Sequence, residues 1–383
     1  MHVGRVVTAL LASGVLLAGC GAGPSQGPPE PIAPVPRGQS AGAGPDTLGT
    51  PSFTVVAAGD VLIHPPLTEQ ATADGKGRRD YSALFAGIKP VIEGADLAIC
   101  HLEVPLADAD GPFTGYPLFS APPEVAGALA ATGYDSCSTA SNHTMDQGPA
   151  GVADTLDALD AAGLKHTGSA RSAREAATPL IVDAHGAKVG LVSYTFGFNQ
   201  GTSVPSGSPW LGNRLDPAKV LAEARKAKAA GAEVVIASLH WGIEDRHEPT
   251  ADQQRIAKQL LADPAVDLIV GHHAHVVQPF EKIGGKWVAY GLGNQIARHE
   301  QPRGTTEEGA IARFRFVKTP DGWAIDKAEY IPTLVDLGPP IRLRDLTTDS
   351  EVDNARRTKA LDRTDEVVLS RAAGDAGLTR PGT

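Results

Sequence analysis

From Phe53 onward, short apolar runs of strand type alternate with stretches in which apolar residues recur at helical spacing. Val152, Leu156 and Leu159, for example, fall at positions i, i+4 and i+7 and predict the buried stripe of one helix. Chains that alternate in this way form α/β sheets with helices on their faces. The expected strands are 53–58, 95–100, 134–139, 188–195, 233–240 and 266–270, and the expected helices are 122–131, 151–162, 216–230 and one that begins at Thr250.

Local signals refine this organisation. Thr250 and Gln253 fit a capping box at the start of their helix. Gly284-Gly285 predicts one hairpin turn, and residues 320–322 predict a second hairpin that joins 311–317 to 323–331. We therefore expect a main α/β domain over 51–300, a β-hairpin extension of it over 301–344, and a charged tail over 345–383 with one surface helix.

The first fifty residues differ in character from the rest. An apolar run from Val6 to Ala18 leads into Leu17-Ala18-Gly19-Cys20, the shape of a secretory signal that is removed. The run is too short for a membrane span, which needs about twenty apolar residues. Residues 20–50 are rich in Pro, Gly, Ser and Ala and predict a disordered tether.

The end of this signal resembles the bacterial lipobox, in which the cysteine is acylated and becomes the mature N-terminus. The resemblance implies a signal peptide over 1–19 and a lipid anchor at Cys20. The protein would then be extracytoplasmic and attached to the outer face of the cytoplasmic membrane. An ordinary secretion signal with an incidental cysteine is the alternative.

Composition and charge exclude several classes of protein. With 42% hydrophobic and 20% charged residues, the chain can bury a large core. It carries 44 acidic and 34 basic side chains and a formal net charge of -10, so its surface has no general attraction for a nucleic-acid backbone or for anionic lipid headgroups. We expect no nucleic-acid partner.

Polar residues follow or end several of the apolar runs. These residues are Asp60, Glu103, Asn142-His143, His240 and His273-Ala274-His275. Because ligands bind at the carboxyl ends of strands in open α/β sheets, these segments are expected to converge on one crevice. Carboxylate, amide and imidazole groups are together the ligand set of Zn, Mn or Fe, whereas Ca²⁺ sites use few or no histidines.

Each of these positions also has a simpler interpretation. Asp60 after a strand is compatible with an ordinary turn, and His240 with a hydrogen-bonded core histidine. His273 and His275 are compatible with a solvated loop, although alternate residues of an extended segment face the same way and would reach one site together. It is the joint pattern that favours a metal site.

Several motifs, in order along the chain, resemble those of the CapA-type poly-γ-glutamate capsule-synthesis family, which is similar to the calcineurin-like metallophosphoesterases. The motifs are 59–64, 96–105, 140–143 with 146–148, 240–244, 271–279 and 290–294. The resemblance implies a four-layer α-β-β-α sandwich with a site for two divalent metal ions, Mn, Fe or Zn, at the strand ends. It implies metal ligation by Asp60, Glu103, Asn142, His240, His273 and His275.

The resemblance also implies roles around the metals. Glu103 would bridge the two ions, and His143, oriented by Asp146, would be the acid that faces the leaving group. Two cations about 4 Å apart would stabilise a phosphoryl group and lower the pKa of a bound water. Substrate contact or support of the ligands is expected from His64, Glu244, His272 and Asn294.

The sequence departs from the family pattern at four positions. Phosphoesterases of the wider superfamily have Asp-x-His at the first strand, but Leu62 stands two residues after Asp60 and leaves that ligand missing. His64 either substitutes for it, contacts substrate, or is a simple loop histidine. The other three departures are Glu103 for an Asp, His101 for the Asn before Leu-Glu, and Gln295 for the Phe after Asn294.

Cys100 and Cys137 lie near the ends of two strands that are expected to be neighbours. Outside the cytoplasm a disulfide is chemically permitted. Because bridge geometry between parallel strands is demanding, two buried thiols are the expected state.

Three functions are compatible with these features. The first is an extracytoplasmic metal-dependent hydrolase of a phosphoester or related bond in capsule or envelope metabolism. The second is a non-catalytic subunit that binds an anionic polymer and works with membrane proteins of capsule synthesis and export. A substrate-binding lipoprotein of a transporter is the third, but it leaves His240, His273 and His275 unexplained.

Overall fold

The computed structural model describes residues 49–382, which form two β-sheets with helices on their outer faces. The predicted signal peptide (1–19), Cys20 and nearly all of the predicted tether (20–50) lie outside the described residues. Within 49–382, no helix has the length and apolar character that crossing a membrane requires.

The first sheet has nine strands in the described part of the chain. Its path runs β14-β13-β12-β1-β2-β3-β4, while β11 pairs with β1 and β15 pairs with β13. β1, β2, β3 and β4 are parallel to one another, and β12, β13 and β14 continue the sheet in antiparallel fashion. The strands are β1 (Ser52–Val61), β2 (Leu97–Leu102), β3 (Ser136–Ser138), β4 (Lys165–Thr167), β11 (Asn294–Ile296), β12 (Glu308–Thr319), β13 (Gly322–Asp336), β14 (Arg342–Asp345) and β15 (Leu378–Thr379).

The second sheet has the order β5-β6-β7-β8-β10-β9. Its four central strands are parallel, and an antiparallel strand lies at each edge. The hairpin predicted at Gly284-Gly285 is confirmed as the connection between β9 and β10. The strands are β5 (Leu180–Ala184), β6 (Ala187–Thr195), β7 (Val234–His240), β8 (Leu268–His272), β9 (Phe280–Ile283) and β10 (Lys286–Ala289).

The helices begin and end where the sequence carries local signals. Asp216 caps α7, and Thr250 with Gln253 forms the predicted capping box of α8. The helices are α1 (Pro65–Asp74), α2 (Ser82–Phe85), α3 (Lys89–Glu93), α4 (Glu124–Thr132), α5 (Gly148–Ala161), α6 (Ala173–Ala176), α7 (Pro217–Ala229), α8 (Ala251–Leu261) and α9 (Asn354–Val368), with short 3-10 turns η1 (Ala86–Ile88) and η2 (Pro209–Leu211).

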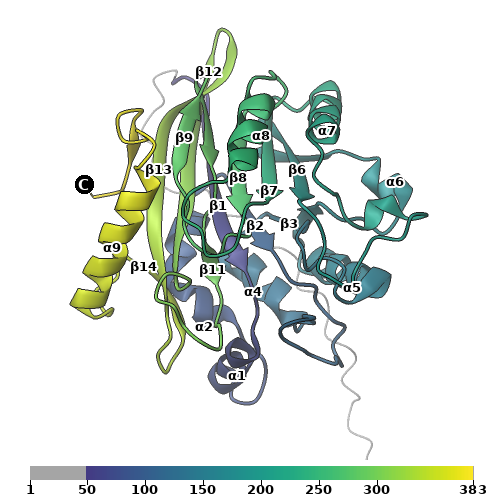
Figure 1. Ribbon diagram of the computed structural model, residues 1–383, viewed down its shortest axis with the longest axis vertical. Helices are drawn as coiled ribbons and strands as arrows, with labels where there is room; N and C mark the ends of the chain where they lie inside the picture. Colours follow the sequence, from purple (N-terminus) through teal and green to yellow (C-terminus); the bar gives the residue numbers. More distant parts are fainter. Residues whose placement is uncertain (1–48, 383) are drawn as a thin grey trace, which may run out of the picture. The chain divides into compact units, whose positions relative to one another are not determined.

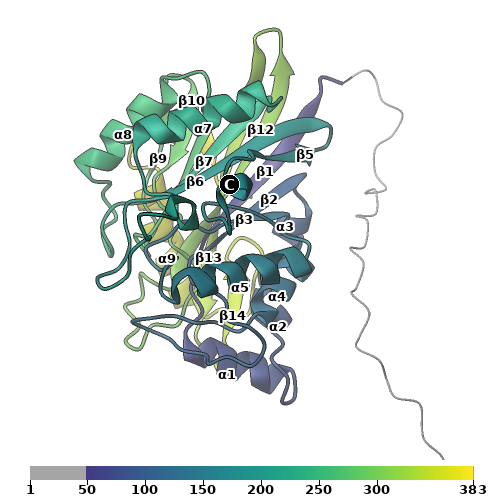
Figure 2. The ribbon, with the colours of Figure 1, turned by 90° about the vertical axis from the view of Figure 1, so that its right-hand side faces the viewer.

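Three buried clusters show that the fold has four layers. Side chains of β1 alternate, so that Val56 packs under the helices α1 to α5 and Val55 packs against the second sheet. A third cluster joins the outer face of the second sheet to α7 and α8. Figure 2 shows α7 and α8 on one side of the strands and α1, α4 and α5 on the other. The predicted four-layer α-β-β-α sandwich is therefore confirmed.

The C-terminal part of the chain is integrated into this sandwich. β12 and β13 form the second predicted hairpin, and both strands are longer than the sequence suggested because β13 also pairs with β14 and β15. The expected helix of the tail is α9, which lies beside β13 (Figure 1). It is more than a surface element, since Val368 and then Ala373 and Leu378 join the core between the sheets.

The cysteine prediction was wrong, because Cys100 and Cys137 form a disulfide. The two residues are register partners on the adjacent parallel strands β2 and β3, with their Cα atoms 4.4 Å apart. The sequence predicted that β2 and β3 are neighbours, but it does not give their register. The two sulfur atoms meet because Cys100 and Cys137 are opposite each other in that register.

Replacing both cysteines (Cys100→Ala with Cys137→Ala) is expected to lower the free energy of unfolding by about 3 kcal/mol, because the unfolded chain is no longer constrained by the cross-link. Urea denaturation with and without a reductant measures this. The native chain should lose a similar amount of stability on reduction, and the double variant should not respond. Insensitivity of the native chain to reductant would contradict the cross-link.

Candidate metal centre

Asp60 lies at the end of β1, enclosed between the two sheets. Its side chain is buried, and its Oδ2 accepts a hydrogen bond of 3.2 Å from the backbone N–H of His273. His275 Nδ1 lies 3.2 Å from Oδ2, and His272 Nδ1 lies 3.3 Å from Oδ1. Gly59 permits this arrangement, because a Cβ at that position would lie 2.1 Å from the carbonyl oxygen of Gly293.

Glu103 follows β2 directly and is equally buried. Neither of its carboxylate oxygens has a hydrogen-bond partner within the described residues. Its Oε1 lies 3.6 Å from His275 Nε2 and 3.9 Å from His240 Nε2. Ligand atoms of Glu103, His273 and His275 all fall within 4.8 Å of one another, a separation that one metal ion can span.

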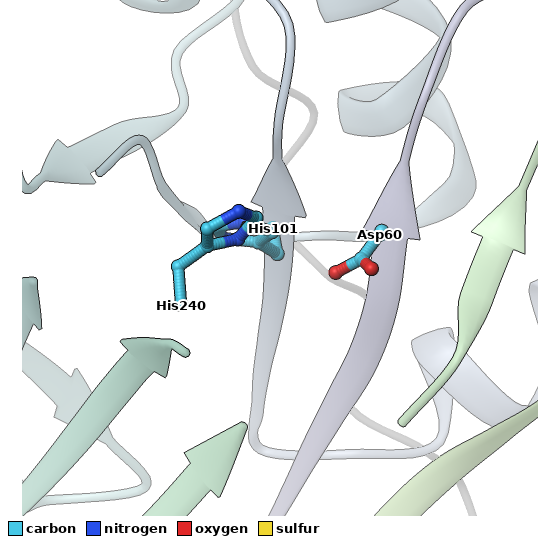
Figure 3. A group of neighbouring side chains, drawn as sticks. All are labelled: Asp60, His101 and His240. Atoms are coloured by element: carbon cyan, nitrogen blue, oxygen red, sulfur yellow. The ribbon is translucent and has the colours of Figure 1, made fainter. Parts of the chain in front are cut away.

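A second group with the same spacing contains Asp60, His101 and His240 (Figure 3). His101 Nε2 lies 3.0 Å from His240 Nδ1, and His101 Nδ1 lies 2.7 Å from the hydroxyl of Ser138. The ring of His101 also stacks on His272 at a centroid distance of 4.0 Å. Sequence analysis noted His101 only as a departure from the family pattern. The sequence did contain a signal for His101: it lies two residues before Glu103, so both side chains are on the same face of an extended strand.

Burial and close charges set the protonation of this cluster. Burial raises the pKa of Glu103 well above its usual value. Burial acts in the same direction on Asp60, but contacts with His272 and His275 outweigh it and hold the pKa of Asp60 well below its usual value. For His275, burial opposes protonation, yet the charges of Glu103 and Asp60 raise its pKa to about 10.

Burial favours the neutral form of three other central histidines, His101, His240 and His273. Burial lowers the pKa of His273 to about 3 and that of His101 and His240 well below the usual value. Neutral imidazole is the form that coordinates metal ions, so these side chains are already in their ligand state.

The segment after β8 reaches the site by a route that the sequence did not predict. His273 and His275 were expected on an extended segment with alternating faces, but they have φ values of 90° and 55° in a bent loop. Such angles are uncommon outside glycine and cost on the order of 1–3 kcal/mol each. The loop thereby turns both imidazoles toward Glu103.

Asn142 and His143 lie in the loop after β3, opposite the histidines. Asn142 Oδ1 lies 2.8 Å from His240 Nε2, which places the amide oxygen beside the second group, that of Asp60, His101 and His240. His143 Nδ1 donates to Asp146 Oδ2 at 2.6 Å, and the N–H of Phe119 donates to the same oxygen at 2.8 Å. His143 and Asp146, which the sequence analysis paired, are therefore in direct contact.

Asn199, in the loop after β6, links these two side chains and was missed by sequence analysis. Its Oδ1 accepts from Asn142 Nδ2 at 2.9 Å, and its Nδ2 lies 3.0 Å from His143 Nδ1. No local pattern in the sequence distinguishes it from other loop asparagines.

The four residues expected around the ligands occupy different positions. His272 lies against Asp60 and His101, and Asn294 Oδ1 lies 2.9 Å from His275 Nδ1. Glu244 is exposed and acts on Glu103 and His275 only through its charge. His64 is in neither of the two groups of metal-binding spacing, and its Nδ1 accepts from the N–H of Arg298 at 3.2 Å.

Several buried side-chain atoms at this site have no hydrogen-bond partner within the described residues, which indicates whether the residues suit a metal ion. Besides both oxygens of Glu103, Asp60 Oδ1 and the Nδ1 atoms of His272 and His273 lack hydrogen bonds within 49–382. Buried polar groups are normally paired, because an unpaired one costs roughly 1–3 kcal/mol. Buried carboxylates and imidazoles whose ligand atoms lack hydrogen bonds fit divalent Mn, Fe or Zn.

The chain is similar to several known proteins. The chain is 26% identical to the capsule biosynthesis protein CapA of Bacillus anthracis over 271 residues, which covers 68% of this chain and 63% of that protein. It is 28% identical to the PGA biosynthesis protein CapA of Bacillus subtilis over 241 residues, which covers 60% of this chain and 62% of that protein. The matched part thus spans a little under two thirds of each relative.

A solved structure of a calcineurin-like phosphoesterase from Bacillus subtilis is also similar. It superposes with a TM-score of 0.46 at 16% sequence identity and covers 84% of this chain and 99% of that chain. A family model described as bacterial capsule synthesis protein PGA_cap matches residues 54–299, from the start of β1 to just beyond β11. The chain therefore belongs to the PGA_cap family of bacterial capsule synthesis proteins.

Proposed function

We propose that this protein is an extracytoplasmic, metal-dependent hydrolase of phosphoester or related bonds that acts in the biosynthesis of poly-γ-glutamate or another anionic capsule polymer. The observation that carries this proposal is the environment of Glu103. Its carboxylate is buried among histidines, and neither oxygen has a hydrogen bond within the described residues. Burial favours the protonated form of this group, and a bound cation would stabilise the ionised carboxylate.

The candidate ligands are assigned from the residues that surround Glu103 and Asp60. The proposed set for two divalent ions is Asp60, Glu103, Asn142, His240, His273 and His275. Glu103 stands between His240 and His275, 3.9 and 3.6 Å from their Nε2 atoms, which suits it to bridge two ions. When bound, such ions stabilise charge on a phosphoryl group and lower the pKa of a bound water toward neutrality.

His143 is the proposed proton donor to the leaving oxygen. Its Nδ1 is held by Asp146, which leaves Nε2 as the atom that can exchange a proton with substrate. The edge-on contact with Phe119, at a centroid distance of 4.9 Å, limits rotation of the ring. Asp146 would stabilise the imidazolium in the same way as the carboxylate of a catalytic triad does.

His101 is proposed to position His240. Its Nδ1 is fixed by the hydroxyl of Ser138, and its Nε2 contacts His240 Nδ1, so that His240 Nε2 is directed toward Asn142 and Glu103. The partner of a ligating imidazole fixes its tautomer and orientation.

Attachment to the membrane through Cys20 and the tether 20–50 remains part of the proposal. The Cys100–Cys137 disulfide supports an oxidising compartment. The proposed partners are the membrane through this anchor, membrane proteins of capsule synthesis, and an anionic polymer or phosphoester substrate.

A non-catalytic role is the second candidate, in which the same cleft holds an anionic polymer as part of a membrane complex for capsule synthesis or export. The observation that favours it is Leu62. It occupies the position where the wider superfamily was expected to have a metal-binding histidine, and it packs in the core beneath the helices.

Metal binding is expected to stabilise the native chain and to depend on Glu103. At 100 times the dissociation constant, a bound ion adds about 2.7 kcal/mol to the free energy of unfolding. Glu103→Gln should remove most of this gain from Mn²⁺ or Zn²⁺, as followed by thermal unfolding and by elemental analysis of bound metal. Glu366→Gln is the matched control, since it removes the same charge from an exposed position of α9. Equal metal binding by both variants would contradict the assignment.

His101→Leu is expected to weaken metal binding by about 10- to 100-fold, the usual effect of losing a partner of a ligating histidine. His101→Asn restores a polar partner for His240 Nδ1 and should recover most of the affinity. Competition with a chelator measures both variants. A His101→Asn variant as weak as His101→Leu would argue that His101 coordinates the metal itself.

His143→Ala separates the two candidate functions. For a hydrolase, kcat on a diester substrate should fall by roughly 100- to 10,000-fold while the metal content is unchanged. In a strain that lacks the native protein, the variant should then fail to restore capsule. Full rescue of the capsule by His143→Ala, together with no hydrolysis by the metal-loaded native chain, would favour the polymer-binding role.

A further inference from the structure

A second pair of histidines flanks the metal centre and is used by no step described above. His64 and His299 have ring centroids 4.9 Å apart, and His299 lies 5.8 Å from the ring of His275. Phe119 contacts His64 and His143 edge-on, at 5.3 and 4.9 Å, and so separates the pair from His143. The pair therefore borders the site on the side of His275.

The hydrogen bonds determine which nitrogen of His64 carries its proton. The backbone N–H of Arg298 can only donate, and its acceptor is His64 Nδ1 at 3.2 Å. The carbonyl of Leu62 is also 3.2 Å from Nδ1, but it already accepts from the backbone N–H of His64. The arrangement that pairs every group leaves Nδ1 unprotonated, so Nε2 carries the proton and has no partner within 49–382.

His299 is fixed in a corresponding way. Asn294 Oδ1 pairs with His275 Nδ1 and Asn294 Nδ2 donates to the carbonyl of Thr306, which sets the orientation of the amide. Nδ2 therefore also faces His299 Nε2, at 3.3 Å, as a donor. The proton of His299 then resides on Nδ1, which has no partner among the residues that the structure describes.

The charge of Arg298, the residue before His299, acts on the His299 ring. Arg298 lies between β11 and His299. Its guanidinium donates to the carbonyl of His299 and has no acidic partner within 49–382. The nearest acid that acts on His299 is Glu307, whose oxygens already accept from the N–H of Gly304 and the hydroxyl of Thr306.

We infer that His64, His299 and Arg298 form an oxyanion subsite, separate from the metal ligands, that binds a second anionic group of the substrate. This inference rests on the proposed function, because it places one anionic group at the metals and another at this subsite. Two N–H donors fixed in orientation, together with a guanidinium that has no acidic partner within 49–382, suit a carboxylate or a phosphate.

Anion titration of the metal-free full chain tests the subsite independently of hydrolysis. The probes are inorganic phosphate and glutarate, followed by the imidazole ¹⁵N signals and by calorimetry. The double variant His64→Leu with His299→Leu should bind the preferred probe at least about tenfold more weakly, the effect of losing hydrogen bonds to a charged group. The probe that binds more tightly identifies the group as phosphate or carboxylate.

Two controls distinguish the loss of the N–H donors from the loss of the histidine rings and from a general effect on folding. His64→Gln with His299→Asn keeps an N–H donor at each position and should retain affinity within about threefold. His185→Leu replaces an exposed histidine of the β5–β6 turn and should have no effect. Arg298→Gln tests the cation without changing the buried side of the site.

The outcomes distinguish this inference from the proposed function. Unchanged anion binding by the double leucine variant would overturn the subsite, and so would a loss of bound metal in His64→Leu, which would make His64 a ligand. If the chain binds no metal and hydrolyses nothing, yet loses anion affinity only in the leucine variant, the subsite stands and the hydrolase proposal falls.

Discussion

The exclusion of water from Asp60 and Glu103 is the constraint on which the rest of this structure depends. Removing a carboxylate from water costs several kcal/mol unless partners replace the lost hydration. Asp60 has such partners in the N–H of His273 and the imidazole of His275. The oxygens of Glu103 have no hydrogen bonds within the described residues, and burial raises the pKa of this side chain. A buried carboxylate without hydrogen bonds is retained when a function requires it. A bound cation would supply the interactions that Glu103 lacks.

The architecture explains why these carboxylates meet the histidines, and this part could be predicted from the sequence. Parallel strands in both sheets end at the same side of the sandwich, so polar residues that directly follow apolar runs are brought together. Asp60, Glu103 and His240 were found in this way, because each lies at or beside the last residue of its strand. The apolar run 53–58 was predicted as a strand, and the structure shows that it is covered on both faces, with Val56 under the helices and Val55 against the second sheet.

The other contacts of the site depend on which strands are neighbours and in what register, and no local run of residues specifies this. His101 contacts His240 across the two sheets, and the disulfide of Cys100 depends on the register of β2 against β3. Strand order and register are set by the whole fold and not by any one run of residues. The positive φ angles of His273 and His275 are a local exception that the surrounding loop must stabilise, and strained positions of this kind concentrate at functional sites.

The replacement of the expected first-strand histidine by Leu62 makes physical sense in this context. Leu62 is buried beneath the helices, so a histidine there would need a metal or another partner to offset its burial. His64, two residues later, has reached the rim of the site and finds its partner in the N–H of Arg298. Burial lowers its pKa to about 3, and that of His299 to about 4, so both rings stay neutral donors beside the charged His275. A lysine in the same place would add a second positive charge next to His275 and compete with a metal ion for Glu103. His299, the member of the subsite that lies beside His275, can thus orient an anion without adding a positive charge of its own next to a bound cation.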